Sequence, residues 1–334
     1  MEEEARFWEN VRENDVKCNL CAYRCVIKDG QRGICRVRIN RGGKLYTESY
    51  GTVVSLAIDP IEKKPLYHFH PGSLAFSIGT ASCNFRCLHC QNYTLSAYGL
   101  DEVSYRYMGV RSLIDRVKEN RCDGIAYTYN EPTVWYEYTY DCSKAAHEED
   151  IYNVYVTNGY ITEEPLREIA PYLDAMNIDI KGNDAFYRKV CKAKLEPVLD
   201  TCRLARSLGI HIELTYLIIP GYNDDNQNIE SFCDFVVGDL GGETPVHFTR
   251  FFPYYKMADA QPTSYQTLLR AYTIAKAKKL DFVYIGNVLD REHNSTFCPK
   301  CNSLLIERGT FNTHLVGLEG DRCRNCGRRI PIVL

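Results

Sequence analysis

The sequence lacks any run of about twenty apolar residues, so we expect no helix that crosses a membrane. Its start, Met1-Glu2-Glu3-Glu4, is the opposite of a secretory signal peptide. Strong net charge is also missing: 40 basic residues stand against 43 acidic ones, for a formal net charge of −3. That balance gives no overall field to concentrate nucleic acid. We therefore expect a soluble, cytoplasmic protein with no membrane partner.

Cysteine, by contrast, is abundant, with 16 residues in a chain of 334. In a long chain without a secretion signal, clustered cysteines indicate metal sites rather than disulfides. Eleven of the 16 fall in three clusters, at 18–35, 83–90 and 298–326. We expect the others to be buried as small apolar side chains, with a substrate radical on Cys191 as the alternative. These others are Cys122, Cys142, Cys191, Cys202 and Cys233.

The middle cluster is a C-x3-C-x2-C run, Cys83-Asn84-Phe85-Arg86-Cys87-Leu88-His89-Cys90, with no fourth cysteine close behind. Three thiolates on one loop can hold three corners of a cubane [4Fe–4S] cluster and leave one iron open. An open metal position is typical of a catalytic site. The alternating segment Leu74–Gly79 predicts a strand directly before this loop. A zinc site with a distant fourth ligand is the alternative.

At this spacing the run resembles the signature of radical SAM enzymes. The resemblance implies that Cys83, Cys87 and Cys90 are the catalytic ligands and that the open iron chelates S-adenosylmethionine. One electron then splits the sulfonium, leaving methionine and a 5′-deoxyadenosyl radical that abstracts hydrogen from a substrate. An electron donor of the flavodoxin or ferredoxin type is expected with it.

Further segments resemble one subgroup, the AmmeMemoRadiSam-system radical SAM proteins, which are related to the pyruvate formate-lyase activating enzymes. The segments are Asp59–Gly72, Cys83–Asn92, Tyr129–Thr133 and Asp179–Lys181. The resemblance covers nearly the whole chain, from the first cysteines to Gly286-Asn287-Val288. It leaves the substrate open, either a small molecule or a protein.

Residues 74–290 predict alternating strands and helices. Strands are expected at 74–79, 124–128, 152–157, 175–180, 211–219, 246–251 and 282–285, with helices between them. Repeated βα units imply a parallel sheet with helices outside it. The family resemblance implies a partial TIM-like (β/α)6 barrel with its chemistry at the carboxyl ends of the strands.

Smaller segments flank this predicted core. Residues 1–50 are expected to begin with a short polar helix and to form a four-cysteine metal module, 51–73 a bridge, and 291–334 a zinc-ribbon-like module. The first module has Cys18, Cys21, Cys25 and Cys35, which suit zinc, a single iron or a second iron–sulfur cluster. The last has two C-x2-C pairs suited to structural zinc, Cys298, Cys301, Cys323 and Cys326. Arginines make it basic, which indicates a solvated face or a patch for RNA or a partner protein.

Polar residues follow the predicted strands where a cofactor would bind. Asn130 and Glu131 offer the carbonyl and carboxylate that an ammonium group needs, although Glu131 also suits a helix start. They lie where the family usually has a glycine-glycine-glutamate motif, with Tyr129 and Asn130 replacing the glycines. Thr157 and Asn158 suit contacts to ribose or carboxylate.

Three more residues extend the predicted cofactor site. Asp179 and Lys181 lie on one face of a strand, in a segment that resembles the activating enzymes. Lys181 suits the methionine carboxylate, Asp179 suits ordering Lys181 or binding a monovalent cation, and a plain ion pair is the alternative. His89 occupies the position where an aromatic residue contacts adenine in the family, or it bonds to a cluster sulfur.

Three functions therefore compete. The first is a radical SAM enzyme that abstracts hydrogen from an unidentified substrate. The second is an activase that places a glycyl radical on a partner enzyme. The third is a metal-stapled module that binds RNA or protein without chemistry. Polar residues at several strand ends argue against the third, because a binding module has no need of them around an open cluster.

Overall fold

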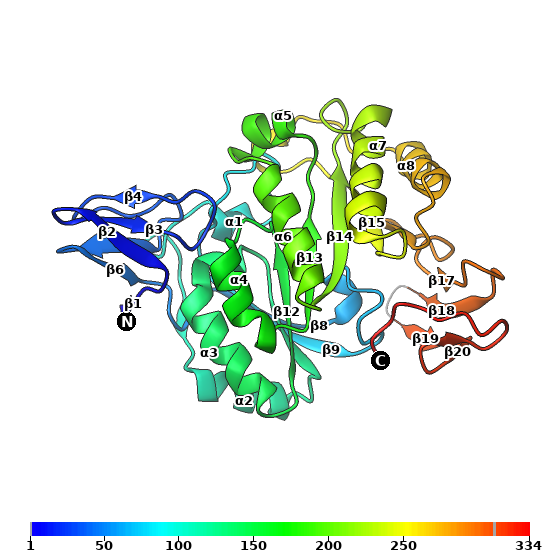
Figure 1. Cartoon of the computed structure of the whole chain (residues 1–334), viewed down its shortest axis with the longest axis horizontal. Coiled ribbons are helices and arrows are strands. Elements are labelled where there is room, and N and C mark those ends of the chain that lie inside the picture. The colour runs from blue at the N-terminus through cyan, green and yellow to red at the C-terminus, as the bar shows by residue number, and fades with distance from the viewer. Residues whose placement is uncertain (1, 310–311) are drawn as a thin grey trace.

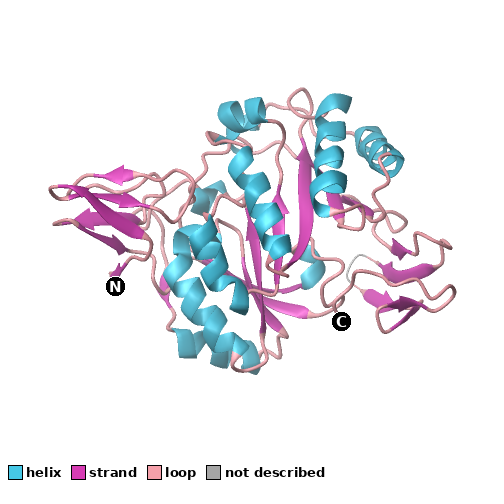
Figure 2. Cartoon of the chain, in the orientation of Figure 1, coloured by secondary structure: helices cyan, strands magenta, loops and turns pink. Residues whose placement is uncertain are grey.

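The centre of the molecule is an eight-stranded, mostly parallel sheet, seen in a computed structural model that describes residues 2–309 and 312–334. Figures 1 and 2 show helices α3, α4, α6 and α7 in front of this sheet. Its order is β16-β15-β14-β13-β12-β11-β9-β8, and only β8 is antiparallel. The strands are β8 Ser55–Pro60, β9 Leu74–Gly79, β11 Gly124–Tyr127, β12 Tyr152–Thr157, β13 Ala175–Asp179, β14 His211–Ile218, β15 Val246–Arg250 and β16 Val283–Gly286.

The parallel strands follow chain order across the sheet, so right-handed crossovers place the connecting helices on one face. The main helices are α2 Val110–Glu119, α3 Tyr136–His147, α4 Glu163–Ile169, α6 Glu196–Ser207, α7 Asn226–Phe235 and α8 Tyr265–Ala277. Their ends follow local chemistry: the Asp225 side chain accepts a hydrogen bond from Asn228 N at 2.9 Å, and Gly209 follows α6 at φ +80°.

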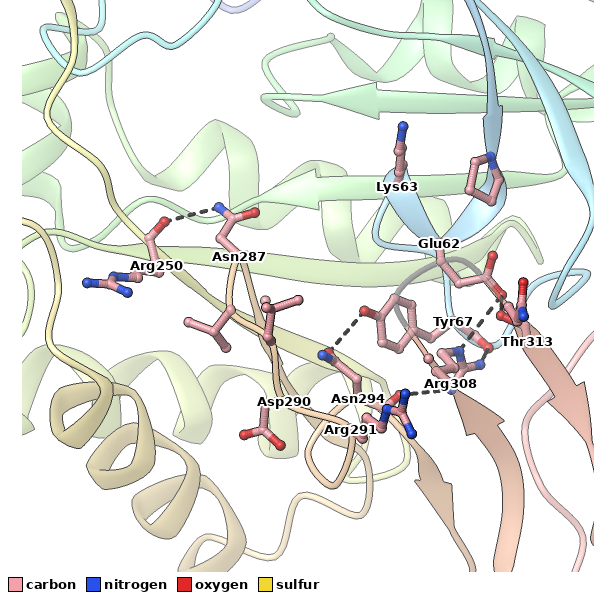
Figure 3. Close-up of a pocket in the computed structure, with 16 residues that line it drawn as sticks. Glu62, Lys63, Tyr67, Arg250, Asn287, Asp290, Arg291, Asn294, Arg308 and Thr313 are labelled. Carbon is pink, nitrogen blue, oxygen red and sulfur yellow. Dashed lines mark hydrogen bonds and ion pairs between the residues drawn. The ribbon is translucent and has the colours of Figure 1, made fainter.

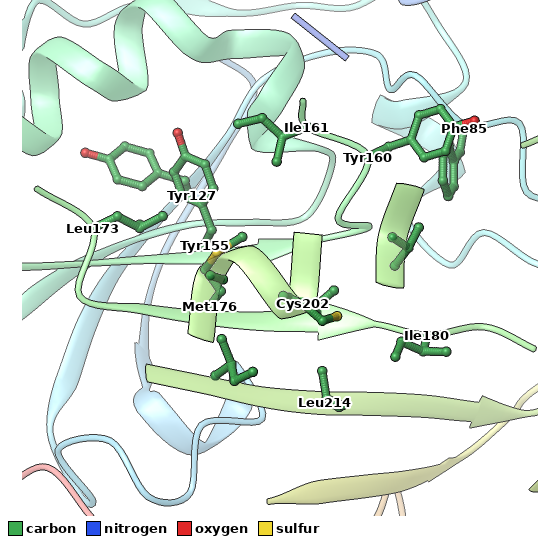
Figure 4. Close-up of a cluster of buried hydrophobic side chains, with 14 of the residues drawn as sticks. Phe85, Tyr127, Tyr155, Tyr160, Ile161, Leu173, Met176, Ile180, Cys202 and Leu214 are labelled. Atoms are coloured by element: carbon green, nitrogen blue, oxygen red, sulfur yellow. The ribbon is translucent and has the colours of Figure 1, made fainter. Parts of the chain in front are cut away.

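The main apolar core lies between the helices and the sheet. Figure 4 shows part of it, where Tyr155, Met176 and Leu214 from neighbouring strands pack near Cys202 of α6. All five cysteines outside the clusters are buried, as the sequence predicts.

The other face of the sheet is covered at one end by the segment that follows β8. Ile61, Leu66 and Phe69 form a separate buried cluster with residues of β9, β11, β12 and β13. The expected bridge of 51–73 therefore contains an eighth strand and part of the packing of the sheet. Beyond this cluster the same face is polar, with buried Asn177, Glu213 and Thr215.

Two predictions about elements were wrong. The resemblance implied the six strands of a (β/α)6 barrel, but the described sheet has the seven parallel strands that alternation predicts, with β8 added at its edge. The N-terminal residues form strands rather than a polar helix, because Trp8–Arg12 pairs antiparallel with Asp15–Cys18 and buries Val16 and Cys18. This module contains β1 Glu3–Glu4, β2 Trp8–Arg12, β3 Asp15–Cys18, β4 Val26–Ile27, β5 Arg38–Arg41 and β6 Lys44–Thr47.

Two small β-modules lie at opposite ends of the molecule (Figure 1). The C-terminal one contains β17 Thr296–Phe297, β18 Leu304–Arg308, β19 Thr313–Leu315, β20 Leu318–Glu319 and β21 Arg322–Cys323. Shorter elements complete the chain: β7 Thr52–Val53, β10 Arg106–Tyr107, α1 Tyr93–Ser96, α5 Asp184–Phe186, single-turn helices at Ile61–Lys63, Pro132–Trp135, Ala170–Tyr172 and Tyr255–Met257, and π turns at Tyr187–Cys191 and Val236–Leu240. Among the described residues, we find no helix with the length and hydropathy to cross a bilayer.

Candidate active site

The three-cysteine loop leaves β9 at the carboxyl edge of the parallel strands. Gly79 ends β9 so close to β11 that a Cβ there would lie 2.5 Å from the Thr128 carbonyl oxygen, so a side chain does not fit. The π turn Tyr187–Cys191 holds the backbone of the loop by two hydrogen bonds. Arg86 N donates to Cys191 O at 3.0 Å, and Leu88 N donates to Val190 O at 3.1 Å. The backbone of the loop is thus positioned by pairing with another strand connection.

The three thiols are partly buried and have polar groups beside them. Phe85 N donates to Cys83 Sγ at 3.4 Å, and Cys90 Sγ lies 3.0 Å from Ser96 Oγ. Burial, together with the nearby Glu131 carboxylate, raises the pKa of Cys83, and burial raises the pKa of Cys90. These thiols therefore need a cation to become thiolates, as metal binding supplies.

The loop also carries side chains suited to an iron–sulfur cluster. Two buried side-chain nitrogens on the same loop, Asn84 Nδ2 and His89 Nδ1, have no hydrogen-bond partner in the described structure. Such nitrogens are suited to cluster sulfur or to a bound cofactor.

Glu131 joins two strand ends beside Cys83. It is 1% exposed, and its Oε1 accepts from Thr133 N (3.0 Å), Thr133 Oγ1 (2.6 Å) and Thr157 Oγ1 (2.8 Å). Its Oε2 accepts from Asn158 N at 2.8 Å. Burial raises the pKa of Glu131 even though these donors oppose the rise. The carboxylate thus ties the turn after β11 to the turn after β12.

The two asparagines predicted for the cofactor both contact the cysteine loop. Asn130 accepts from Thr80 N at 3.2 Å and donates to Ser82 O at 2.8 Å. Asn158 Nδ2 donates to Asn84 Oδ1 at 2.8 Å and lies 3.7 Å from Cys83 Sγ. The structure therefore brings the predicted residues of β11 and β12 together at Cys83.

Asp179 and Lys181 lie on the other side of the loop, near Cys87. Lys181 Nζ is 2.6 Å from Asp179 Oδ2, and the Lys181 side chain is 13% exposed. Although burial opposes its charge, Asp179 and the Cys87 sulfur raise the pKa of Lys181. The neighbouring Cys191 thiol and burial raise the pKa of Cys87.

His89 is buried in the loop, with its ring centroid 5.9 Å from that of Phe186. Burial, with a smaller effect of the Lys181 charge, lowers the pKa of His89 to about 3. The ring is therefore neutral at physiological pH, and one of its nitrogens can accept while the other donates.

Sequence reasoning missed a buried group of hydrogen-bonded residues around Asp59. Tyr129, at φ +72°, donates to Asp59 Oδ2 at 2.9 Å, and Lys64 Nζ lies 2.8 Å from the same atom. Burial alone would raise the pKa of Asp59, but the hydrogen bonds and charges of Lys64 and Lys63 and the Tyr129 hydroxyl lower it. Asp59 and Tyr129 both lie in segments that resemble the family, but no local pattern in the sequence predicts a contact between residues so far apart in the chain.

The C-terminal cysteines form a separate four-thiol site. Cys298, Cys301, Cys323 and Cys326 all lie within 4.8 Å of one another, with Sγ–Sγ distances of 3.5 Å (Cys298–Cys326) and 3.6 Å (Cys301–Cys323). Thiolates about 2.3 Å from one tetrahedral ion lie nearly this close together. The geometry suits a single metal ion.

A cavity of about 1010 Å³ lies at the gap between the sheet edges β8 and β16 (Figure 3). It is lined by Glu62 and Lys63 after β8, by Arg250, and by the segment Gly286–Arg291 after β16. None of the three loop cysteines lines it. Arg250, at the end of β15, is one of its residues.

Part of the chain, including the cysteine loop, is similar to known proteins. A model of the "Radical SAM superfamily" matches residues 77–235. An uncharacterized protein of Methanocaldococcus jannaschii, MJ0808, is 51% identical over 333 residues, which is 99% of each chain. The (2S)-3-sulfopropanediol dehydratase activating enzyme of Klebsiella oxytoca is 28% identical over 121 residues, 36% of this chain and 38% of that enzyme.

A solved structure shares the fold. Streptococcus suis SuiB bound to S-adenosylmethionine superposes with a TM-score of 0.51 at 10% identity, covering 68% of this chain and 53% of that one. Residues 77–235, which include the cysteine loop, therefore match the radical SAM superfamily.

Proposed function

We propose that this chain is an AmmeMemoRadiSam-type radical SAM enzyme that abstracts hydrogen from its substrate. The observation that supports this most is the grouping of polar residues from three strand ends around one cysteine loop. Asn158 Nδ2 lies 3.7 Å from Cys83 Sγ, Glu131 accepts from Asn158 N, and the Lys181 charge acts on the Cys87 thiol. A module that only binds a partner has no use for these groups around three free thiols.

The residues have distinct roles in this proposal. When bound at Cys83, Cys87 and Cys90, a [4Fe–4S] cluster with one open iron supplies chelation of S-adenosylmethionine and the electron for its cleavage. Lys181, held by Asp179, offers a cation for the methionine carboxylate. The unpaired nitrogens of Asn84 and His89 offer hydrogen bonds to sulfur or cofactor. Glu131 positions the turns that face Cys83.

The substrate enters, in this proposal, through the cavity between β8 and β16. Its volume of about 1010 Å³ is at the upper end of ligand pockets, which run to about 1,000 Å³. Lys63, Arg250 and Arg291 place positive charge along it, together with the acidic residues Glu62 and Asp290. Such a lining suits a polar substrate that carries negative charge. We further propose a ferredoxin- or flavodoxin-type donor as the source of the electron.

An activase acting on a partner protein is the second candidate, favoured by the similarity to the Klebsiella activating enzyme over 121 residues. The two candidates differ in the size of the hydrogen donor. Reduced enzyme and S-adenosylmethionine would be incubated with deuterated cell extract, separated into low-mass and high-mass fractions. Deuterium in 5′-deoxyadenosine from the low-mass fraction alone supports a small substrate, and from the high-mass fraction alone supports the activase.

The proposal itself is tested by turnover. We expect protein reconstituted anaerobically with iron and sulfide and reduced with dithionite to form 5′-deoxyadenosine, measured by liquid chromatography. Cys83→Ala, Cys87→Ala and Cys90→Ala should each abolish the product, because the cluster loses a ligand. Cys202→Ala, a buried cysteine of α6, is the matched control and should retain it. Unchanged product from the three loop variants would refute the assignment.

A further inference from the structure

The three cysteine clusters of this chain differ in how close their thiols lie. In the C-terminal module, four sulfurs lie within 4.8 Å of one another, with the spacing of a single tetrahedral ion. Among the described residues, no three of Cys18, Cys21, Cys25 and Cys35 meet that limit. The same chain therefore builds one compact four-thiol site and one expanded four-thiol site.

The expanded thiols nevertheless surround one space. Cys18 ends β3, Cys21 pairs with Ile161 as an isolated bridge, Cys25 precedes β4 and Cys35 precedes β5. All four line one small cavity, whose other walls are mostly aliphatic: Leu20, Ile27, Ile34 and Val134. A dry pocket edged by four sulfurs can enclose an iron–sulfur cluster, whose potential depends on its exposure to solvent.

Gly33 keeps this space open between two of the sulfurs. A Cβ at Gly33 would lie 3.8 Å from Cys35 Sγ, 3.9 Å from Cys25 Sγ and 3.1 Å from Ile27 Cδ1. A side chain here would extend toward the cavity and against Ile27. The absence of a side chain at Gly33 therefore leaves space in this cavity, and the residue also lies in a turn.

The cysteine loop at 83–90 gives an internal comparison. Its three thiols also do not all lie within 4.8 Å of one another, and the superfamily places a cubane cluster on such a loop. A cubane separates its ligands because iron and sulfide atoms lie between them, whereas one zinc ion brings four sulfurs together. By this measure the N-terminal site resembles the cluster loop and differs from the C-terminal site.

A buried cation faces the N-terminal thiols. Arg38 is 1% exposed, its Nη1 lies 3.4 Å from Cys18 Sγ, and its Nη2 pairs with buried Glu137. Its Nε has no partner in the described structure. A guanidinium that donates to sulfur stabilises the negative charge that four thiolates bring to a cluster.

From these observations we propose that Cys18, Cys21, Cys25 and Cys35 hold a second, fully ligated cubane iron–sulfur cluster rather than zinc. The site adjoins the catalytic loop, because Ser82 Oγ, one residue before Cys83, donates to Cys35 O at 2.6 Å. Arg86 of the same loop bonds to Ile34 O. Four protein ligands leave no open iron, so this second site does not chelate S-adenosylmethionine.

The test removes the catalytic ligands and keeps the N-terminal ones. The triple variant Cys83→Ala/Cys87→Ala/Cys90→Ala, purified and reconstituted anaerobically, should retain about four irons and four sulfides per chain. Its dithionite-reduced electron paramagnetic resonance signal should not change when S-adenosylmethionine is added. Metal analysis should find zinc at no more than the C-terminal site. Zinc in a second site, with no iron or sulfide, would overturn the proposal.

Two further samples keep the result interpretable. The variant Cys18→Ala/Cys35→Ala should lose the signal that is insensitive to S-adenosylmethionine and keep the sensitive one. If a variant does not fold, the unaltered protein still decides: about eight irons per chain support two cubanes, and about four irons with a second zinc contradict the proposal. Cys202→Ala controls for cysteine loss. Absence of only the sensitive signal would refute the proposed function and leave this inference standing.

Discussion

At the scale of single residues, Glu131 shows how the turns around the cluster loop are held. Its two oxygens accept four hydrogen bonds from Thr133, Thr157 and Asn158. A buried carboxylate with this many donors is a structural joint between two strand ends. The Glu131 charge acts on Cys83, so the turns that Glu131 holds lie beside the proposed cofactor site.

We expect Glu131→Ala to lower the free energy of unfolding by about 3 kcal/mol, because several buried donors lose their acceptor at about 1–3 kcal/mol each. Glu131→Gln, which keeps part of the bonding, should cost less. Both should weaken the binding of S-adenosylmethionine. Denaturant unfolding and isothermal titration calorimetry measure the two effects. An unchanged free energy of unfolding for Glu131→Ala would show that Glu131 does not hold the two turns together.

His68 carries a prediction about pH. It is fully buried, its Nε2 lies 2.6 Å from Tyr284 Oη and its Nδ1 lies 3.0 Å from Pro331 O, so both nitrogens are used within the protein. Burial lowers the pKa of His68 to about 3, against about 6.5 for a free histidine. Between these values the unfolded chain binds the proton and the folded chain does not, so stability rises with pH.

The unfolding free energy should therefore fall as the pH drops below about 6.5, and His68 should contribute about 1 kcal/mol per pH unit between pH 6 and 5. His68→Gln removes this contribution and should flatten the profile by that amount. Urea unfolding at several pH values gives the slopes for both proteins. Equal slopes would show that His68 does not cause the dependence.

At the scale of elements, a buried ion pair joins the N-terminal module to the core. Arg38 of β5 pairs with Glu137 of α3, and both side chains are almost fully buried. Removing one partner of such a pair leaves an uncompensated charge, which typically costs about 3–5 kcal/mol. Replacing both by apolar residues avoids that cost.

We predict that Arg38→Met lowers the free energy of unfolding by about 3–5 kcal/mol and that Arg38→Met/Glu137→Leu recovers much of the loss. Chemical denaturation of the two single variants, the double variant and the unaltered protein forms the cycle. Purely additive losses would mean that the two charges do not stabilise each other.

At the scale of the whole molecule, the C-terminal module supports the segment beside the cavity between β8 and β16. Arg308 of β18 is 3% exposed and donates to Tyr67 O and to Thr296 Oγ1. His70 N donates to Val333 O at 2.8 Å. The far end of the chain therefore holds the segment that packs under the sheet.

Loss of the C-terminal metal site should destabilise both the C-terminal module and the segment 66–70 that it contacts. In Cys298→Ala, we expect faster hydrogen exchange in β17–β19 and in residues 66–70, and unchanged exchange in β12 and α6. Mass spectrometry of peptides measures this pattern. Exchange that rises only within 291–334 would show that the module does not support the cavity.

Local patterns in the sequence predict much of the core. Alternation and helix-end signals predict the strands from Leu74 to Gly286 to within about two residues. The spacing of the cysteines also predicts the loop at the end of β9 and a four-thiol site at 298–326, and the latter is compact in the structure. These features depend on residues close together in the chain.

Long-range contacts decided the rest, because no local pattern encodes the partner of a side chain. The sequence by itself determined the βα order, the cysteine loop and the polar strand ends. Only the tertiary structure decided that Ser55–Pro60 adds an antiparallel edge, that Asp59 pairs with Tyr129, and that the two ends of the sheet leave a cavity. These depend on burial and on hydrogen bonds between segments that meet only when the sheet forms.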